Sequence, residues 1–179
     1  VNGDGFEDLL LGISSGIGAG NAYIFFGGAT PGIDHCELSG EGTNSEFGTH
    51  VLGAGDISGD GISDLMISAP GYTDTVAAGG RVYVIFGSTA LADTISASDA
   101  DIFLSGDVMD GRFGDGLCAP GDINGDGIDD ILIGSEGGSG AGKAYILLGS
   151  PTFVSPVTRS AADLDAIITG ESADDGFAI

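Results

Sequence analysis

Basic side chains, tryptophan and long apolar runs are what this sequence lacks. Lysine and arginine together number 4 in 179 residues, against 27 aspartates and glutamates, so the formal net charge is -23, and tryptophan is absent. A chain of this charge repels polyanions, which excludes nucleic acid as a partner and favours cations. No apolar run approaches the ~20 residues that a membrane-spanning helix requires, so we expect no membrane insertion.

Cysteine is also scarce, because the chain carries only Cys36 and Cys118. Two cysteines are too few for a disulfide framework. The sequence leaves two alternatives open: a bridge between them, or two thiols that pack as small hydrophobic side chains. The chain nevertheless has enough apolar side chains for a folded core, since 42% of its residues are hydrophobic.

An acidic, glycine-rich loop occurs three times and divides the chain into repeats, with matched aspartates at Asp4, Asp60 and Asp126. Each loop is followed by a short apolar run, a Gly-rich turn and a second run with tyrosine at its third position. A Leu-Ser-Gly or Ile-Thr-Gly segment and then a Phe-Gly or Phe-Ala pair complete each repeat. Strand-length segments rich in Val, Ile, Phe and Tyr predict β-structure throughout, and only 160–167 is a candidate for a helical turn or two.

Four strands per repeat predict an all-β fold, a β-propeller of four-stranded antiparallel blades. Propellers close with ~4 to 8 blades, and this chain holds about three, so the predicted ring is incomplete. We expect a partial blade at 1–46, blades at 47–112 and 113–176, and the start of a further blade at 177–179. The chain either continues into further blades in a longer protein or associates with a second copy to close the ring. An open arc is the third alternative.

The third loop, GDINGDGIDD at 121–130, places oxygen-bearing side chains at alternate positions. Its candidate ligands are Asp122, Asn124, Asp126 and Asp130, and hard oxygen ligands in this number suit Ca²⁺ better than Zn²⁺. The loop begins like an EF-hand, but Ile133 stands where the EF-hand requires a glutamate. The equivalent side chains are Asp56, Ser58, Asp60 and Asp64 in the second loop and Asn2, Asp4 and Asp8 in the first. We expect affinity to fall from the third loop to the first; the alternative is that all three are solvated Asp-Gly turns.

Together these motifs resemble the FG-GAP repeats of integrin α-subunit propellers and of bacterial surface and secreted proteins. The resemblance covers essentially the whole chain and rests on Phe47-Gly48, Ala69-Pro70, the acidic loops and the Gly-x-x-Tyr-x-x-x-Gly strands. The chain departs from it at Ser135-Glu136, where Ala-Pro is usual, and at Phe177-Ala178, where Phe-Gly is usual. The resemblance implies a calcium-stabilised extracellular propeller with its metal loops at one rim. By loop spacing and by this resemblance, Phe6, Ile62 and Ile128 contribute backbone carbonyls to the three sites.

Several other motifs fit enzyme chemistry only in part. GGSGAGKA at 137–144 lacks the Ser or Thr and the following helix of a phosphate-binding loop, and residues 12–16 fit the G-x-S-x-G elbow without its strand-to-helix turn. Asp129 and Asp130 are adjacent in a strand and therefore point in opposite directions, unlike the paired acids of a glycosidase. His50 is expected to pack or to line the channel. We therefore predict no catalytic residues.

The sequence thus predicts a non-enzymatic, calcium-binding propeller segment of a secreted or cell-surface protein, with a role in adhesion or ligand binding. Two alternatives remain open. One is a non-catalytic propeller part of a larger extracellular enzyme, such as a phospholipase or a polysaccharide-degrading protein, and the other is a carbohydrate-binding lectin. The partner is a protein or glycan ligand that the sequence does not identify.

Overall fold

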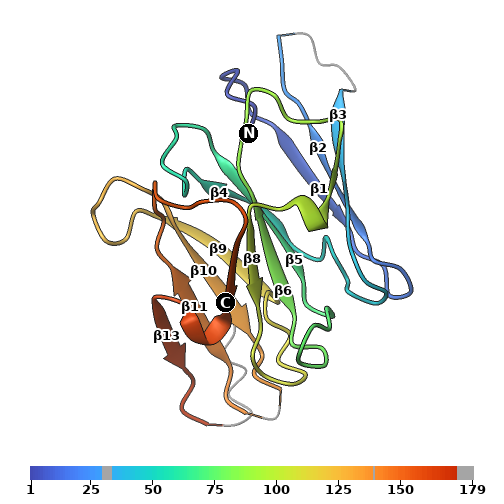
Figure 1. Ribbon diagram of the computed structural model, residues 1–179, viewed down its shortest axis with the longest axis vertical. Coiled ribbons are helices and arrows are strands. Elements are labelled where there is room, and N and C mark those ends of the chain that lie inside the picture. The colour runs from blue at the N-terminus through green and yellow to red at the C-terminus, as the bar shows by residue number, and fades with distance from the viewer. Residues whose placement is uncertain (30–33, 139, 173–179) are drawn as a thin grey trace.

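The computed structural model describes residues 1–29, 34–138 and 140–172 (Figure 1). Within these ranges the chain forms β-strands and two short 3-10 helices, and no α-helix is present. The predicted all-β fold is therefore confirmed. The start of a further blade that we expected at 177–179, including Phe177 and Ala178, lies outside the described residues.

The strands form three sheets. The first sheet contains β1 (Leu9–Ile13), β2 (Asn21–Phe25), β3 (His35–Ser39) and β7 (Thr94–Ser96). The second contains β4 (Val51–Gly55), β5 (Asp64–Ala69), β6 (Arg81–Ile85), β8 (Ile102–Ser105) and β12 (Val157–Ser160). The third contains β9 (Gly116–Gly121), β10 (Asp130–Ser135), β11 (Lys143–Leu147) and β13 (Ala166–Thr169). The sheets lie side by side, and β4 contacts both β1 and β9 at their inner edges (Figure 1).

The three repeats share one strand register. Leu11 pairs with Tyr23 in the first sheet, and the equivalent pairs are Ile67 with Tyr83 and Ile133 with Tyr145. Because side chains alternate between the two faces of a strand, a shared register sends equivalent residues to equivalent faces. The repeats can therefore be compared residue by residue.

Two strands were not predicted by the sequence analysis. β7 pairs in parallel with β3, and β12 pairs in parallel with β8, so each joins the sheet formed by the preceding repeat. Each is followed by a 3-10 helix, η1 (Ala97–Asp99) or η2 (Ala161–Asp163), whose first alanine is fully buried. The helical turn expected within 160–167 is the second of these. Each strand and helix together tie one blade to the next.

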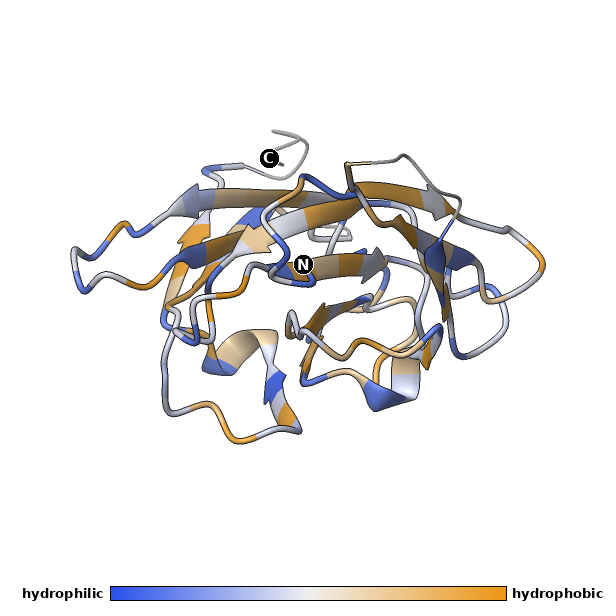
Figure 2. Cartoon of the chain, turned by 90° about the horizontal axis from the view of Figure 1, so that it is seen from above, coloured by the Kyte–Doolittle hydropathy of each residue, from blue (hydrophilic) through white to orange (hydrophobic). Residues whose placement is uncertain are grey.

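Two hydrophobic cores fill the spaces between the sheets. The first interface packs Ala22, Ile24, Cys36 and Leu38 of the first sheet against Leu65, Ile67, Tyr83 and Ile85 of the second. The second interface packs Met66, Val82, Val84, Ile102 and Leu104 of the second sheet against Ile131, Ile133, Tyr145 and Leu147 of the third. Seen from above, hydrophobic stretches run along the strands (Figure 2). The two faces of the middle sheet are thus both covered, which explains why its strands are apolar at consecutive positions.

Candidate metal-binding loops

The three acidic loops occupy equivalent places in the fold. The first precedes β1, the second joins β4 to β5, and the third joins β9 to β10. The backbone N–H of Ser88 donates to the carbonyl of Val1 at 3.0 Å, and that of Ser150 donates to the carbonyl of Ile57 at 2.9 Å. Each of these bonds joins a loop to the repeat that follows it. A Cβ on Gly3 of the first loop would lie 3.5 Å from Ile62 of the second, and Asp129 of the third loop contacts Asp56 of the second, so the loops are neighbours along one rim.

The third loop is shaped by carboxylates that accept hydrogen bonds from its own backbone. Oδ1 of Asp122 accepts from the N–H groups of Gly125 at 2.7 Å and Asp126 at 3.1 Å, and its Oδ2 accepts from Gly127 at 2.8 Å. These donors lower the pKa of Asp122, with the Gly127 N–H as the largest cause. Asn124 donates through Nδ2 to Oδ2 of Asp126 at 2.9 Å. The predicted ligands Asp122, Asn124 and Asp126 therefore lie together, exposed to solvent, on one loop.

The second loop has the same hydrogen bonds from backbone N–H groups to its first aspartate, but it has a serine where the third loop has Asn124. Asp56 accepts from the N–H groups of Asp60 at 3.0 Å and Gly61 at 2.8 Å, as Asp122 does in the third loop. Ser58 stands where the other loops have asparagine, and its Oγ is buried without a hydrogen-bond partner in the described part of the chain. Among the described residues, Ser58 therefore forms no equivalent of the bond from Asn124 to Asp126, and its oxygen is available for another partner.

With Asp122 of the third loop and Asp56 of the second counted as position 1, position 9 is an aspartate in all three loops, and this aspartate is held differently from the rest. Asp8, Asp64 and Asp130 accept through Oδ1 from the N–H groups of Gly27 at 2.9 Å, Gly87 at 2.8 Å and Gly149 at 2.8 Å. Asp64 and Asp130 are fully buried. Burial raises the pKa of Asp64 to about 6, against the opposing effect of its two backbone N–H donors. These aspartates thus connect each loop to the end of the next strand but one, a role that the sequence analysis did not predict.

The donor set fits a hard cation by its chemistry. Each loop offers carboxylate, amide or hydroxyl oxygens, with the carbonyls of Phe6, Ile62 and Ile128 close in sequence, and no sulfur or imidazole lies among them. The unpartnered Oγ of Ser58 is an oxygen in need of a donor or a cation. Within residues 1–29, 34–138 and 140–172, no three Asp, Glu, His or Cys side chains come close enough to hold a metal ion by themselves. Backbone carbonyl, amide and water oxygens would therefore complete any site in these loops.

Sequence analysis missed a contact between two of the loops. Oδ2 of Asp129 accepts from the N–H of Asp56 at 2.9 Å, across 73 residues of sequence. In the sequence, Asp129 stands out only as half of an adjacent acid pair. Its position beside Asp130 gave no sign of this contact, because the neighbour comes from another repeat.

The structure also bears on the cysteines, the glycine-rich segment at 137–144 and His50. Cys36 and Cys118 are both free thiols, so the bridge is excluded. The segment at 137–144 leads into strand β11 rather than a helix, as the sequence analysis expected. His50 is partly buried just before β4, and its Nδ1 has no hydrogen-bond partner in the described residues. No helix in the described ranges has the length and hydrophobicity to cross a bilayer.

Three side-by-side sheets with a shared register and buried interfaces define the chain as a segment of a β-propeller. The family model for the FG-GAP repeat matches residues 47–85 and 113–147. Over these repeats the chain belongs to the FG-GAP repeat family.

Integrin alpha subunits are among the relatives of the chain. It is 33% identical to integrin alpha-5 of Xenopus laevis over 155 residues, which is 83% of this chain and 14% of that protein. It is 36% identical to integrin alpha-IIb of Mus musculus over 129 residues, 66% of this chain and 12% of that protein. It is 37% identical to integrin alpha-PS2 of Drosophila melanogaster over 123 residues, 64% of this chain and 8% of that protein. The chain thus spans about a seventh or less of the length of these relatives.

Proposed function

We propose that this chain is a calcium-binding propeller segment of a secreted or cell-surface protein, and that it serves adhesion or ligand binding without catalysis. The observation that carries the proposal is the recurrence of one oxygen-rich loop at the same rim position in successive blades. The similarity to integrin alpha subunits supports it. Calcium would neutralise clustered carboxylates on a chain whose net charge is -23.

The residues proposed to hold the ions are those that the loop spacing indicates. They are Asp122, Asn124, Asp126, Asp130 and the carbonyl of Ile128 in the third loop; Asp56, Ser58, Asp60, Asp64 and the carbonyl of Ile62 in the second; and Asn2, Asp4, Asp8 and the carbonyl of Phe6 in the first. An ion bound to the folded chain and not to the unfolded chain adds its binding free energy to stability.

Thermal unfolding in excess EDTA and in millimolar CaCl₂ tests the proposal, with MgCl₂ as the control for general charge screening. We expect the melting temperature to rise by several degrees in calcium and by much less in magnesium. Asp126→Ala removes a central ligand of the third loop, so this variant should lose a large part of the calcium-specific rise. Equal, small shifts in calcium and magnesium would contradict the proposal and leave the loops as solvated turns.

We propose that another propeller blade covers the exposed apolar face of the first sheet. Leu9, Leu11 and Ile13 on the outer face of the first sheet are 65%, 46% and 52% exposed, whereas their equivalents Leu65, Ile67 and Ala69 are buried in the first interface. The same kind of blade that covers Leu65 and Ile67 would cover Leu9 and Leu11, either from a longer chain or from a second copy. Sedimentation equilibrium tests the second source: concentration-dependent self-association supports it, and a monomer at all concentrations contradicts it.

A further inference from the structure

Asp129 is the eighth residue of the third loop, and it contacts the second loop. Its Oδ2 accepts a hydrogen bond from the backbone N–H of Asp56 at 2.9 Å. Its own backbone N–H donates to the carbonyl of Asp56 at 3.2 Å. Two hydrogen bonds therefore join Asp129 to the first residue of the neighbouring loop, which is the first proposed ligand of the second site.

The surroundings of this contact are close-packed. Gly55 has a φ of 73°, and a Cβ on it would lie 2.2 Å from Oδ2 of Asp129. A Cβ on Gly59 would lie 3.2 Å from Pro151 and 3.4 Å from Ile128 of the third repeat. With the bond from Ser150 to the carbonyl of Ile57, the third repeat thus lies against the second loop from Gly55 to Gly59.

Only the third loop makes this side-chain contact in the described part of the chain. The eighth position holds Ser63 in the second loop and Glu7 in the first. Neither of these side chains forms a hydrogen bond or ion pair with another loop among the described residues. Between the first and second loops the equivalent residue is Ser63, which has no carboxylate, so Ser63 serves below as the matched position.

We propose that Asp129 is a positioning residue that couples the second and third cation sites, so that an ion in one site raises the affinity of the other. The inference rests on the proposed calcium binding. Ile128 and Asp130 flank Asp129 and are proposed ligands of the third site, so an ion there restrains the Asp129 backbone. Asp129 in turn fixes the backbone of Asp56, whose carboxylate already accepts from the N–H groups of Asp60 and Gly61.

The coupling is reciprocal, because a free energy shared between two sites acts equally in both directions. Isothermal titration with CaCl₂ measures it in an Asp4→Ala background, which removes a ligand of the first site. Adding Asp126→Ala disables the third site, and we expect the calcium Kd of the second site to rise about tenfold, within the usual range for coupled sites. Asp129→Ser introduces the residue that the second loop has at this position, Ser63. In this variant the second-site Kd should be raised to the same value whether residue 126 is aspartate or alanine.

Asp129→Asn separates the hydrogen bond from the charge. The amide oxygen of asparagine still accepts from the N–H of Asp56, so we expect this variant to retain most of the tenfold effect. Ser63→Ala is the matched control at the equivalent position and should change no site. Hydrogen exchange of the Asp56 amide in EDTA gives a readout without metal: it should be faster in Asp129→Ser and unchanged in Ser63→Ala.

The two glycines beside Asp129 provide a second matched pair. Gly55 and Gly121 have similar φ values of 73° and 83°, but a Cβ on Gly121 would stay 3.8 Å from the Asp129 carboxylate. Gly55→Ala should therefore abolish the coupling, whereas Gly121→Ala should keep it although both variants strain the backbone. If the Asp4→Ala protein binds no calcium, the proposed function is wrong. If it binds calcium but the calcium Kd of the second site is unchanged by the Asp126 or Asp129 substitutions, the proposed function stands and the proposed coupling is wrong.

Discussion

The two interfaces between the sheets use equivalent positions of the repeat and differ in the side chains at those positions. At the first interface the apolar side chains from the earlier sheet are Ala22, Ile24, Cys36 and Leu38, and at the second their equivalents are Val82, Val84, Ile102 and Leu104. The second interface therefore buries larger aliphatic side chains at two of four positions, with only Ile24 being larger than its counterpart. Burying a larger apolar surface contributes more to stability, by about 25 cal/mol per Å².

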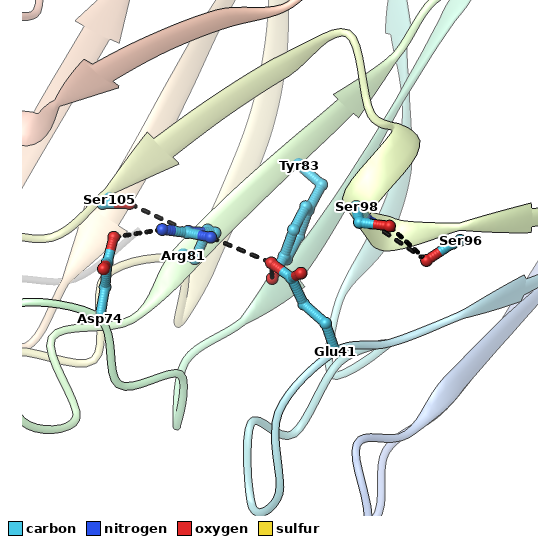
Figure 3. Close-up of polar contacts among 7 residues, drawn as sticks. All are labelled: Glu41, Asp74, Arg81, Tyr83, Ser96, Ser98 and Ser105. Carbon is cyan, nitrogen blue, oxygen red and sulfur yellow. Dashed lines mark hydrogen bonds and ion pairs between the residues drawn. The ribbon is translucent and has the colours of Figure 1, made fainter.

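The first interface instead carries an ionic cluster around the buried Arg81 (Figure 3). The guanidinium forms ion pairs with Glu41, at 3.0 Å, and with Asp74, and its Nε donates to Ser105 at 3.0 Å. Glu41 also accepts from the hydroxyl of Tyr83 at 3.0 Å, which links the first repeat to the second. Burial raises the pKa of Tyr83, and the charge of Glu41 adds to the effect.

At the second interface, the described residues at the equivalent positions form no such cluster. Lys143 replaces Arg81, forms no ion pair among the described residues, and places its Nζ 5.9 Å from the centre of the Tyr145 ring. Asp107 replaces Glu41 and accepts from Tyr145 over a longer distance of 3.4 Å. The repeat thus conserves the aromatic packing and the tyrosine-to-acid link, and the strength of the polar contacts varies with the side chains available.

The largest expected effect tests what the interfaces have in common. Phe47 and Phe113 are 0% and 1% exposed and pack edge-on against Tyr83 and Tyr145, with ring centres 5.3 and 5.2 Å apart. Phe47→Ala and Phe113→Ala should each reduce the free energy of unfolding by about 3 to 5 kcal/mol, as expected for a large cavity in a core. Urea denaturation measures both, and Phe→Leu at each position, with a smaller loss, is available if the alanine variants do not fold. Losses that differ by more than about 2 kcal/mol would contradict a shared apolar plan.

The next effect tests the difference between the interfaces. Arg81→Met removes the partner of Glu41 and leaves its carboxylate partly buried, whereas Lys143→Met removes a charge that forms no ion pair with any residue the structure describes. We expect a loss of about 2 kcal/mol for Arg81→Met, below the 3 to 5 kcal/mol of a fully buried pair because Glu41 and Asp74 retain access to water. Lys143→Met should change stability by less than about 0.5 kcal/mol. Equal losses in urea denaturation would show that the cluster adds nothing beyond packing.

Much of this comparison was accessible from the sequence. The fixed offset of Tyr23, Tyr83 and Tyr145 from the acidic loops was enough to align the repeats, and alternation of side chains then assigns equivalent residues to equivalent faces. The β-propeller prediction is confirmed for that reason. The ligand assignments in the loops stay predictions, and the calcium titrations proposed above test them.

The features that escaped prediction depend on contacts between repeats. β7 and β12 are short and partly polar, so they carry no apolar run, although the pattern Thr-x-Ser-Ala occurs at both 94–97 and 158–161 and was a usable signal. Glu41 and Arg81 are 40 residues apart, and Asp56 and Asp129 are 73 residues apart. Pairs at such separations are determined by how blades stack, which no local pattern of residues encodes.

The smallest expected effect concerns Cys36, which the second interface replaces with Ile102. Burial, with the charges of Asp93 and Glu37, raises the pKa of the Cys36 thiol to about 11, whereas a thiol in an unfolded chain has a pKa of about 8.5. As pH rises above about 8.5 the unfolded state loses this proton first, so the stabilisation is complete below that pH and is lost toward pH 11. We expect the difference in unfolding free energy between the wild type and Cys36→Ala to shrink from pH 7.5 to pH 10, because all other titrating groups are common to both proteins. A difference that stays constant over this range would place the Cys36 thiol in a less buried setting and remove the titratable group that distinguishes the first interface from the second.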